Sequence, residues 1–113
     1  MDNFIFLPVK RNLKKRILVK DILYCKADNT YTEVILCNGD KKIISRTLKD
    51  IEQTMNDLEF FRINRSILIN IKHIIEVNTS VKPNLTITSG ENFYISKSRI
   101  KSLIKMPYFL NKE

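Results

Sequence analysis

Short apolar runs separated by polar residues occupy the first half of the chain. β-branched and aromatic residues dominate these runs, as they do in β-strands. The predicted strands cover residues 4–7, 17–19, 22–25, 31–36 and 42–45, with a basic link over 10–16 and a polar loop over 26–30. Asn38-Gly39 joins the last two strands and is the strongest hairpin signal, because both residues tolerate the positive φ of a type I′ turn.

The spacing of apolar residues becomes helical in the middle of the chain. The residues at this spacing are Leu48, Ile51, Met55 and Leu58. Thr47 is suited to cap the helix, and Asp50 three residues later resembles a capping box with a shorter acid. The pattern therefore predicts one helix of about three turns that covers a face of a sheet.

Strand-like runs return after this helix, over residues 60–70 and 74–77. A second hairpin follows, with strands at 85–88 and 93–95 and a turn at Ser89-Gly90. Residues 96–104 are predicted to form a short amphipathic helix, with Ile100, Leu103 and Ile104 facing inward. The predicted fold class is therefore mainly β, with one covering helix and a short C-terminal helix.

Composition adds a charge imbalance to this picture. The 113 residues suit a single domain, and the hydrophobic fraction of 43% is that of an ordinary globular protein. Twenty Lys and Arg residues stand against twelve Asp and Glu, for a net charge of +8. Such an excess favours a polyanionic partner. The alternative is a basic protein from a background rich in lysine and isoleucine.

Several function classes find no support. No apolar run approaches the roughly 20 residues that span a bilayer, and the N-terminus lacks the features of a signal peptide, so we expect a cytoplasmic protein without membrane insertion. Cys25 and Cys37 lack metal-ligand spacing and are interpreted as small hydrophobic residues. The single histidine, His73, and the two glycines support neither a catalytic site nor a phosphate-binding loop. We expect neither an enzyme nor a cofactor.

Three polar segments are candidates for binding. The first contains Asn29, Thr30 and Tyr31, and its alternative interpretation is a plain β-turn. The second runs from Arg62 to Ser66, with no acid between Glu59 and Glu76; its alternative is a strand entry with Arg62 in a surface ion pair with Glu59. The third is residues 96–99 with Lys101 one turn beyond, and its alternative is a charged helix face.

The second segment carries the residue types that read nucleic acid. Arginine can form paired hydrogen bonds to guanine and asparagine to adenine, while serine binds phosphate. We therefore expect Asn64, Arg65 and Ser66 to form an exposed turn, held by the apolar residues around it.

The order of these motifs resembles the LytTR-type DNA-binding domain. The resemblance lies in residues 21–24, Tyr31-Thr32, Asn38-Gly39, Thr47-Leu48-Lys49, residues 61–66, Ile69-Asn70 and residues 95–99, and it extends over about residues 4–104. It implies short antiparallel strands in stacked sheets. It also implies a transcriptional regulator whose loops enter successive major grooves of double-stranded DNA, on repeated sites and with DNA bending.

Carried over by position, the resemblance implies DNA contacts in the loop that ends at Tyr31 and in residues 64–66 and 96–99, and positive charge adds Arg62 and Lys101. The expected contacts are Asn29, Thr30, Tyr31, Arg62, Asn64, Arg65, Ser66, Lys97, Ser98, Arg99 and Lys101. We expect Arg65 to be the main base reader with Asn64 beside it on base or phosphate, while the other cations hold phosphates. Tyr31 stands where some members have histidine and Ser98 where some have arginine, so the sequence leaves open which residue of 97–99 reaches a base.

Residues 1–113 are expected to be one such domain, and no receiver domain precedes the first strand. The chain is then either a stand-alone regulator or a piece of a longer one. The resemblance suggests a second copy on adjacent DNA repeats and a sensor or inhibitor protein as further partners. The competing hypothesis is a basic module that binds RNA or a protein, in which exposed tyrosines would stack on bases.

Overall fold

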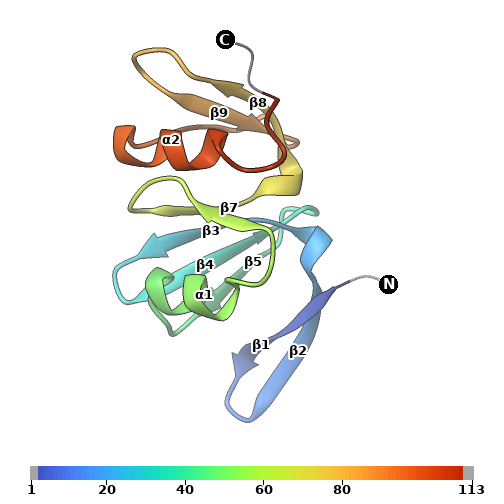
Figure 1. Cartoon of the computed structure of the whole chain (residues 1–113). Helices are drawn as coiled ribbons and strands as arrows, with labels where there is room; N and C mark the ends of the chain where they lie inside the picture. Colours follow the sequence, from blue (N-terminus) through green and yellow to red (C-terminus); the bar gives the residue numbers. More distant parts are fainter. Residues whose placement is uncertain (1–2, 111–113) are drawn as a thin grey trace.

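The computed structural model describes residues 3–110, and within them the fold is mainly β (Figure 1). Ten strands and two α-helices follow one another along the chain. The strands are β1 (Phe4–Lys10), β2 (Leu13–Leu18), β3 (Ile22–Asp28), β4 (Tyr31–Leu36), β5 (Lys41–Ile44), β6 (Phe60–Arg62), β7 (Ile67–Asn70), β8 (Ile74–Asn78), β9 (Asn84–Ile87) and β10 (Asn92–Tyr94). The helices are α1 (Leu48–Thr54) and α2 (Lys97–Ile104), and the short 3₁₀ turns Val19–Asp21 and Ile71–His73 precede β3 and β8.

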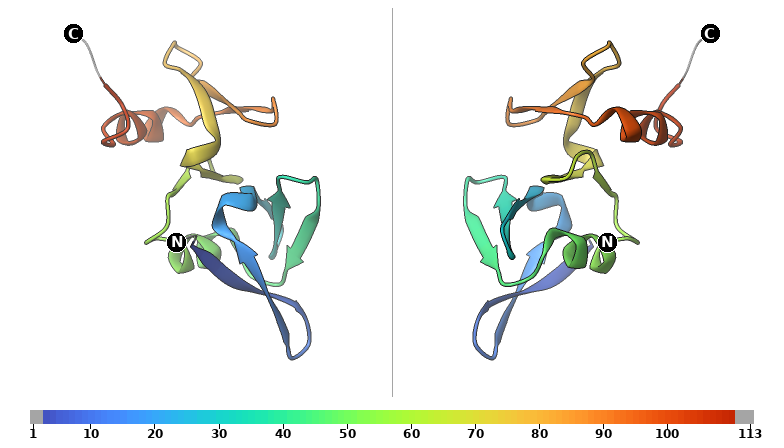
Figure 2. Two further views of the ribbon diagram at one scale, coloured as in Figure 1. Left: turned by 90° about the vertical axis from the view of Figure 1, so that its right-hand side faces the viewer. Right: turned by 90° about the vertical axis from the view of Figure 1, so that its left-hand side faces the viewer.

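The described strands form three sheets, and the prediction of antiparallel strands in stacked sheets is confirmed. β1 and β2 make a two-stranded hairpin, and β10, β9 and β8 make a three-stranded sheet in that order. The central sheet has five strands in the order β5-β4-β3-β7-β6. It lies between the other two sheets along the long axis of the molecule (Figures 1 and 2).

The middle of the central sheet, strands β3 and β7, is buried on both faces. On one face Cys25 and Val34 pack with Leu48 and Ile51 of α1. On the other face Ile67 and Ile69 pack with Leu85 and Ile87 of the three-stranded sheet and Leu103 of α2 (a second cluster of buried residues). This double burial explains why β3 and β7 contain continuous apolar runs where a half-exposed strand would alternate.

Both predicted helices are confirmed, with one difference in length. The Thr47 hydroxyl accepts a hydrogen bond from the Asp50 backbone N–H at 3.2 Å, so Thr47 caps α1. α1 ends at Thr54 with Met55 as its C-cap, so the prediction that Leu58 lies in the helix is wrong. In α2, Leu103 is buried while Ile100 and Ile104 are partly buried.

Two predicted loops are largely strand. β3 continues through Lys26 to Asp28, so the polar loop shrinks to a turn at Asn29 and Thr30. Residues of the predicted basic link likewise belong to β1 and β2, which meet at a turn with φ 61° at Asn12. The ends of these strands are exposed to solvent, so their side chains can be polar. The backbone hydrogen bonds between the strands continue there and do not depend on apolar side chains.

Other predictions concern single residues of this scaffold. Both cysteines are free, with Cys25 buried and Cys37 exposed. The ring nitrogens of His73 contact the Thr88 hydroxyl at 2.9 Å and the Lys20 carbonyl at 2.7 Å, which is a structural arrangement. Among the described helices, none has the length and apolar content needed to cross a membrane.

Candidate nucleic-acid interface

The three polar segments lie on one edge of the molecule, at the left of Figure 1. The loop between β6 and β7, residues 63–66, is at their centre. The Ala27 N–H near the end of β3 donates to the Ser66 carbonyl at 2.9 Å, and the Ser96 N–H before α2 donates to the Ile63 carbonyl at 2.9 Å. Residues far apart in sequence therefore form a continuous surface.

The turn between β3 and β4 presents the first segment. Asp28 and Tyr31 are paired across the strands, which leaves Asn29 and Thr30 as a two-residue connection. Asn29 has φ 55°, a left-handed conformation that asparagine adopts more readily than most residues. The Tyr31 side chain is 47% exposed, and Asn29 and Thr30 are exposed beside it.

Asn64 is not exposed, so the prediction that it belongs to an exposed turn is wrong. Its residue exposure is 1%, and its amide group forms three hydrogen bonds inside the protein. Nδ2 donates to the Tyr94 carbonyl at 2.8 Å, while Oδ1 accepts from the N–H groups of Ser66 at 2.8 Å and Ile67 at 3.0 Å. A buried amide with these partners fixes the loop and ties it to β10.

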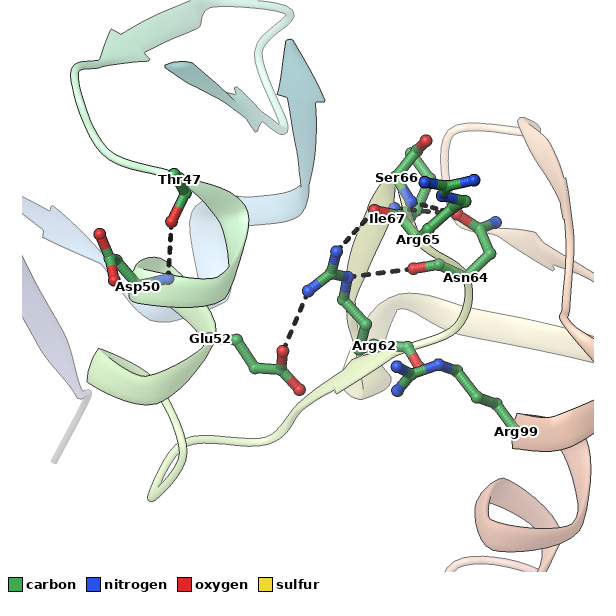
Figure 3. Close-up of polar contacts among 9 residues, drawn as sticks. All are labelled: Thr47, Asp50, Glu52, Arg62, Asn64, Arg65, Ser66, Ile67 and Arg99. Carbon is green, nitrogen blue, oxygen red and sulfur yellow. Dashed lines mark hydrogen bonds and ion pairs between the residues drawn. The ribbon is translucent and has the colours of Figure 1, made fainter. Parts of the chain in front are cut away.

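Arg62 supports the same loop from the other side (Figure 3). Its Nε donates to the Asn64 carbonyl at 3.0 Å, and one terminal nitrogen donates to the Arg65 carbonyl. The other terminal nitrogen forms an ion pair with Glu52 of α1 at 3.1 Å. The predicted alternative of an ion pair is confirmed, but its partner is Glu52, because Glu59 pairs with Lys72 at 3.1 Å.

Arg65 has the opposite environment. Its residue is exposed, and its side chain makes no hydrogen bond or ion pair within the described residues. Its backbone carbonyl is held by Arg62, so the Cα is fixed while the guanidinium group projects into solvent (Figure 3). Ser66 beside it is partly buried, and its backbone is bonded on both sides.

The start of α2 supplies the third segment. Lys97, Ser98 and Lys101 are exposed, whereas Arg99 is partly buried. One terminal nitrogen of Arg99 donates to the Arg62 carbonyl at 3.3 Å, which ties α2 to the end of β6. The exposed N–H groups of a helix start favour anions, so Lys97 and Ser98 stand where a phosphate would be attracted.

Some features of this edge were not predicted. Lys26 is exposed and pairs across the strands with Ile67, so it adds a cation beside the loop at residues 63–66. Lys26 was predicted to lie in a polar loop and was not among the expected contact residues. Tyr94 is 59% exposed because β10 is an edge strand, and its neighbour Phe93 packs on Tyr24 with ring centroids 4.8 Å apart. The exposed carboxylate of Asp28 is the acid closest in sequence to the turn.

The model of the LytTr DNA-binding domain matches residues 14–106 of this chain. The chain belongs to the LytTr family of DNA-binding domains. DNA is therefore the partner of this LytTr domain, and its family is defined by DNA binding and not by catalysis. No curated protein matches the chain.

The fold agrees with this membership. A solved LytTr DNA-binding domain from Bacillus cereus, part of a protein described as a methyl-accepting/DNA response regulator, superposes with a TM-score of 0.72. The two share 21% sequence identity, and the match covers 90% of this chain and 94% of that chain. The stacked-sheet architecture predicted from the sequence is thus the architecture of a known LytTr domain.

Proposed function

We propose that this LytTr domain regulates transcription by binding specific double-stranded DNA sites through the edge formed by the turn at residues 29–31, the loop at 63–66 and the start of α2. The observation that carries the proposal is the contrast at Arg65. Its carbonyl accepts from Arg62, and the Asn64 amide holds the N–H of the next residue, Ser66, while the Arg65 side chain is exposed and without a protein partner among the described residues. Such an ordered backbone with an available guanidinium is suited to base reading.

The other residues of the edge have separate roles in this proposal. The turn with Tyr31 enters a neighbouring groove, and Lys97, Ser98 and Lys101 contact phosphates. Arg99, which packs against the Arg62 carbonyl, orients α2 and adds positive charge. Arg62 and Asn64 position the loop instead of contacting DNA, because their polar atoms already have partners inside the protein.

The dimensions of the molecule suit a site longer than one groove. The longest principal extent is 52 Å, which is about 15 base pairs at roughly 3.4 Å each. Adjacent turns of a major groove lie about 34 Å apart. A rigid edge of this length supports contacts in successive major grooves, with bending of the duplex and occupation of repeated sites by further copies as consequences.

The test is a selection of bound duplexes from a random pool. We expect enrichment of a defined sequence arranged as spaced direct repeats, followed by bending of the selected duplex in an end-to-end energy-transfer measurement. Absence of any enriched sequence would overturn site-specific binding.

The exposed aromatic side chains favour one competing function, an RNA-binding module. Tyr31 and Tyr94 are 47% and 59% exposed on this edge, and exposed aromatic rings can stack on unpaired bases. Competition between the selected duplex and structured RNA at fixed salt separates the two functions. We expect the duplex to displace the RNA.

A further inference from the structure

The β1–β2 hairpin carries a second concentration of positive charge, outside the three segments already described. Its cations are Lys10, Arg11, Lys14, Lys15 and Arg16, and all of them are exposed. No acidic residue occurs over the described residues 3–20. Because no carboxylate in this stretch offsets the charge, the hairpin is a basic surface that attracts polyanions.

The hairpin tip forms one side of a basic hollow of about 680 Å³. Lys10, Arg11 and Lys14 line it from the tip, and Arg46 lines it from the connection after β5. The remaining lining residues are Pro8, Val9, Asn12, Leu13, Ile43 and Ser45. The lining therefore holds four cations and no carboxylate.

This basic hollow lies directly beside the turn at residues 29–31. Thr32, the residue after Tyr31, donates its hydroxyl hydrogen bond to the Arg46 carbonyl at 2.7 Å and pairs with Ile44 across β4 and β5. The hollow thus continues the proposed DNA-binding edge beyond this turn. Figure 1 shows the hairpin at the end of the molecule away from α2.

The local structure of the hairpin presents its tip outward. Lys10 pairs with Leu13, so Arg11 and Asn12 form the connection, and the left-handed φ of 61° at Asn12 closes it tightly. Arg16 has a partner already, because its guanidinium lies 5.2 Å from the centre of the Phe4 ring. Of the other hairpin cations, Lys10, Arg11 and Lys14 line the basic hollow together with Arg46, while Lys15 is exposed outside it.

We propose that the basic hollow binds backbone phosphates of duplex DNA that flank the site read by the loops. The inference rests on the proposed function, since it extends the same edge by one further contact. Duplex DNA is favoured over an acidic protein because the hollow is continuous with that edge. Phosphate contacts add affinity but no sequence preference.

The experiment compares the double variant K10Q/K14Q with the wild-type chain on the duplex selected from a random pool, extended by about ten base pairs, one helical turn, on each side. We expect the slope of log affinity against log salt to fall in magnitude by about 2, since each phosphate contact contributes roughly 0.9. The ratio of specific to random binding is expected to stay unchanged. Removal of the flank on one side should make variant and wild type equal, while removal of the other flank should not.

A matched control carries the same loss of charge at the opposite end of the central strands. Lys20 and Lys72 lie beside Asp57 and Glu59 in a different hollow, so K20Q/K72Q makes the same change in net charge away from the basic hollow, together with loss of the Lys72–Glu59 ion pair. The K20Q/K72Q variant should change the salt slope less than K10Q/K14Q does. Its effect should be the same on duplexes with both flanks and on duplexes that lack either flank. Unfolding curves for both double variants check that the fold is retained.

Equal behaviour of the two double variants on every duplex would overturn the flanking contact. That result leaves the proposed function intact if Arg65→Ala still relaxes sequence preference. Loss of the flank effect together with no effect of Arg65→Ala would instead contradict the proposed function itself.

Discussion

Asn64 and Arg65 are neighbours in the chain, but their side chains have opposite environments. The amide of Asn64 bonds three backbone groups in the interior, while the guanidinium of Arg65 reaches solvent. A buried amide that loses its partners costs about 1–3 kcal/mol, so the two residues should respond differently to substitution. Changes at Asn64 should act on folding, and changes at Arg65 should act on DNA recognition.

Arg65→Ala should weaken binding to the selected duplex by roughly 1–3 kcal/mol and relax preference at one base position. The reason is the loss of a paired contact to a base edge with no change in the scaffold. Binding isotherms on the selected duplex and its single-position variants measure it. Lys101→Ala is the control, and it should weaken all sequences alike. Equal losses on selected and random duplex for Arg65→Ala would contradict base reading.

The stability of the protein should fall above about pH 9 because of Cys25. Burial raises the pKa of the Cys25 thiol to about 12, whereas the unfolded thiol ionises near 9. The folded state then retains a proton that the unfolded state loses, so the free energy of unfolding is constant below the unfolded pKa and falls as pH rises toward 12. The limiting slope is about 1.4 kcal/mol per pH unit.

Urea unfolding between pH 8 and 10 measures this dependence, before Tyr24 contributes. Burial, with the hydrogen bond to Glu91, raises the pKa of Tyr24 as well, but its unfolded value is 10.0. Cys25→Ala should flatten the pH dependence of the free energy of unfolding in this window. Cys37→Ala should preserve most of that pH dependence. An unchanged slope in Cys25→Ala would exclude the buried thiol as its source.

At the scale of elements, an ion pair couples α1 to the loop between β6 and β7. Glu52 lies on α1, and Arg62 at the end of β6 joins it to the carbonyls of Asn64 and Arg65. The planar, forked guanidinium can serve several acceptors in one fixed geometry, which a lysine ammonium cannot. The shape of the Arg62 guanidinium, and not only its charge, therefore holds the loop in place.

Arg62→Lys tests this role, because it keeps the charge but loses the fork. We expect weaker binding to the selected duplex with little change in the salt slope. The loss should be smaller when Arg65 is already alanine, with a coupling energy of roughly 0.5–3 kcal/mol in a double-mutant cycle. If Arg62 contacted phosphate instead, lysine would preserve most of the affinity, and the two substitutions would add.

At the scale of the whole molecule, three stacked sheets create one long edge. Strands β3 and β7 of the central sheet are buried between two apolar clusters, and the strand ends and connections beside them reach solvent. The three-stranded sheet with α2 extends this edge at one end, and the β1–β2 hairpin extends it at the other (Figures 1 and 2). The edge can then follow a duplex because its loops are fixed by a rigid interior.

The sequence by itself determined what depends on local chemistry. It predicted most of the strands, the Thr47 cap of α1, the amphipathic α2 and the motif that indicated the family. It also predicted the Asn38-Gly39 hairpin, although only Gly39 of this pair has the positive φ that a type I′ turn needs at both residues. The tertiary structure decided the environment of each polar side chain. Glu52 and Arg62 are ten residues apart, and Asn64 and the Tyr94 carbonyl are thirty apart. No local pattern specifies these pairs, since they form only when sheets and helices pack, and that packing buries Asn64 while it leaves Arg65 exposed to solvent.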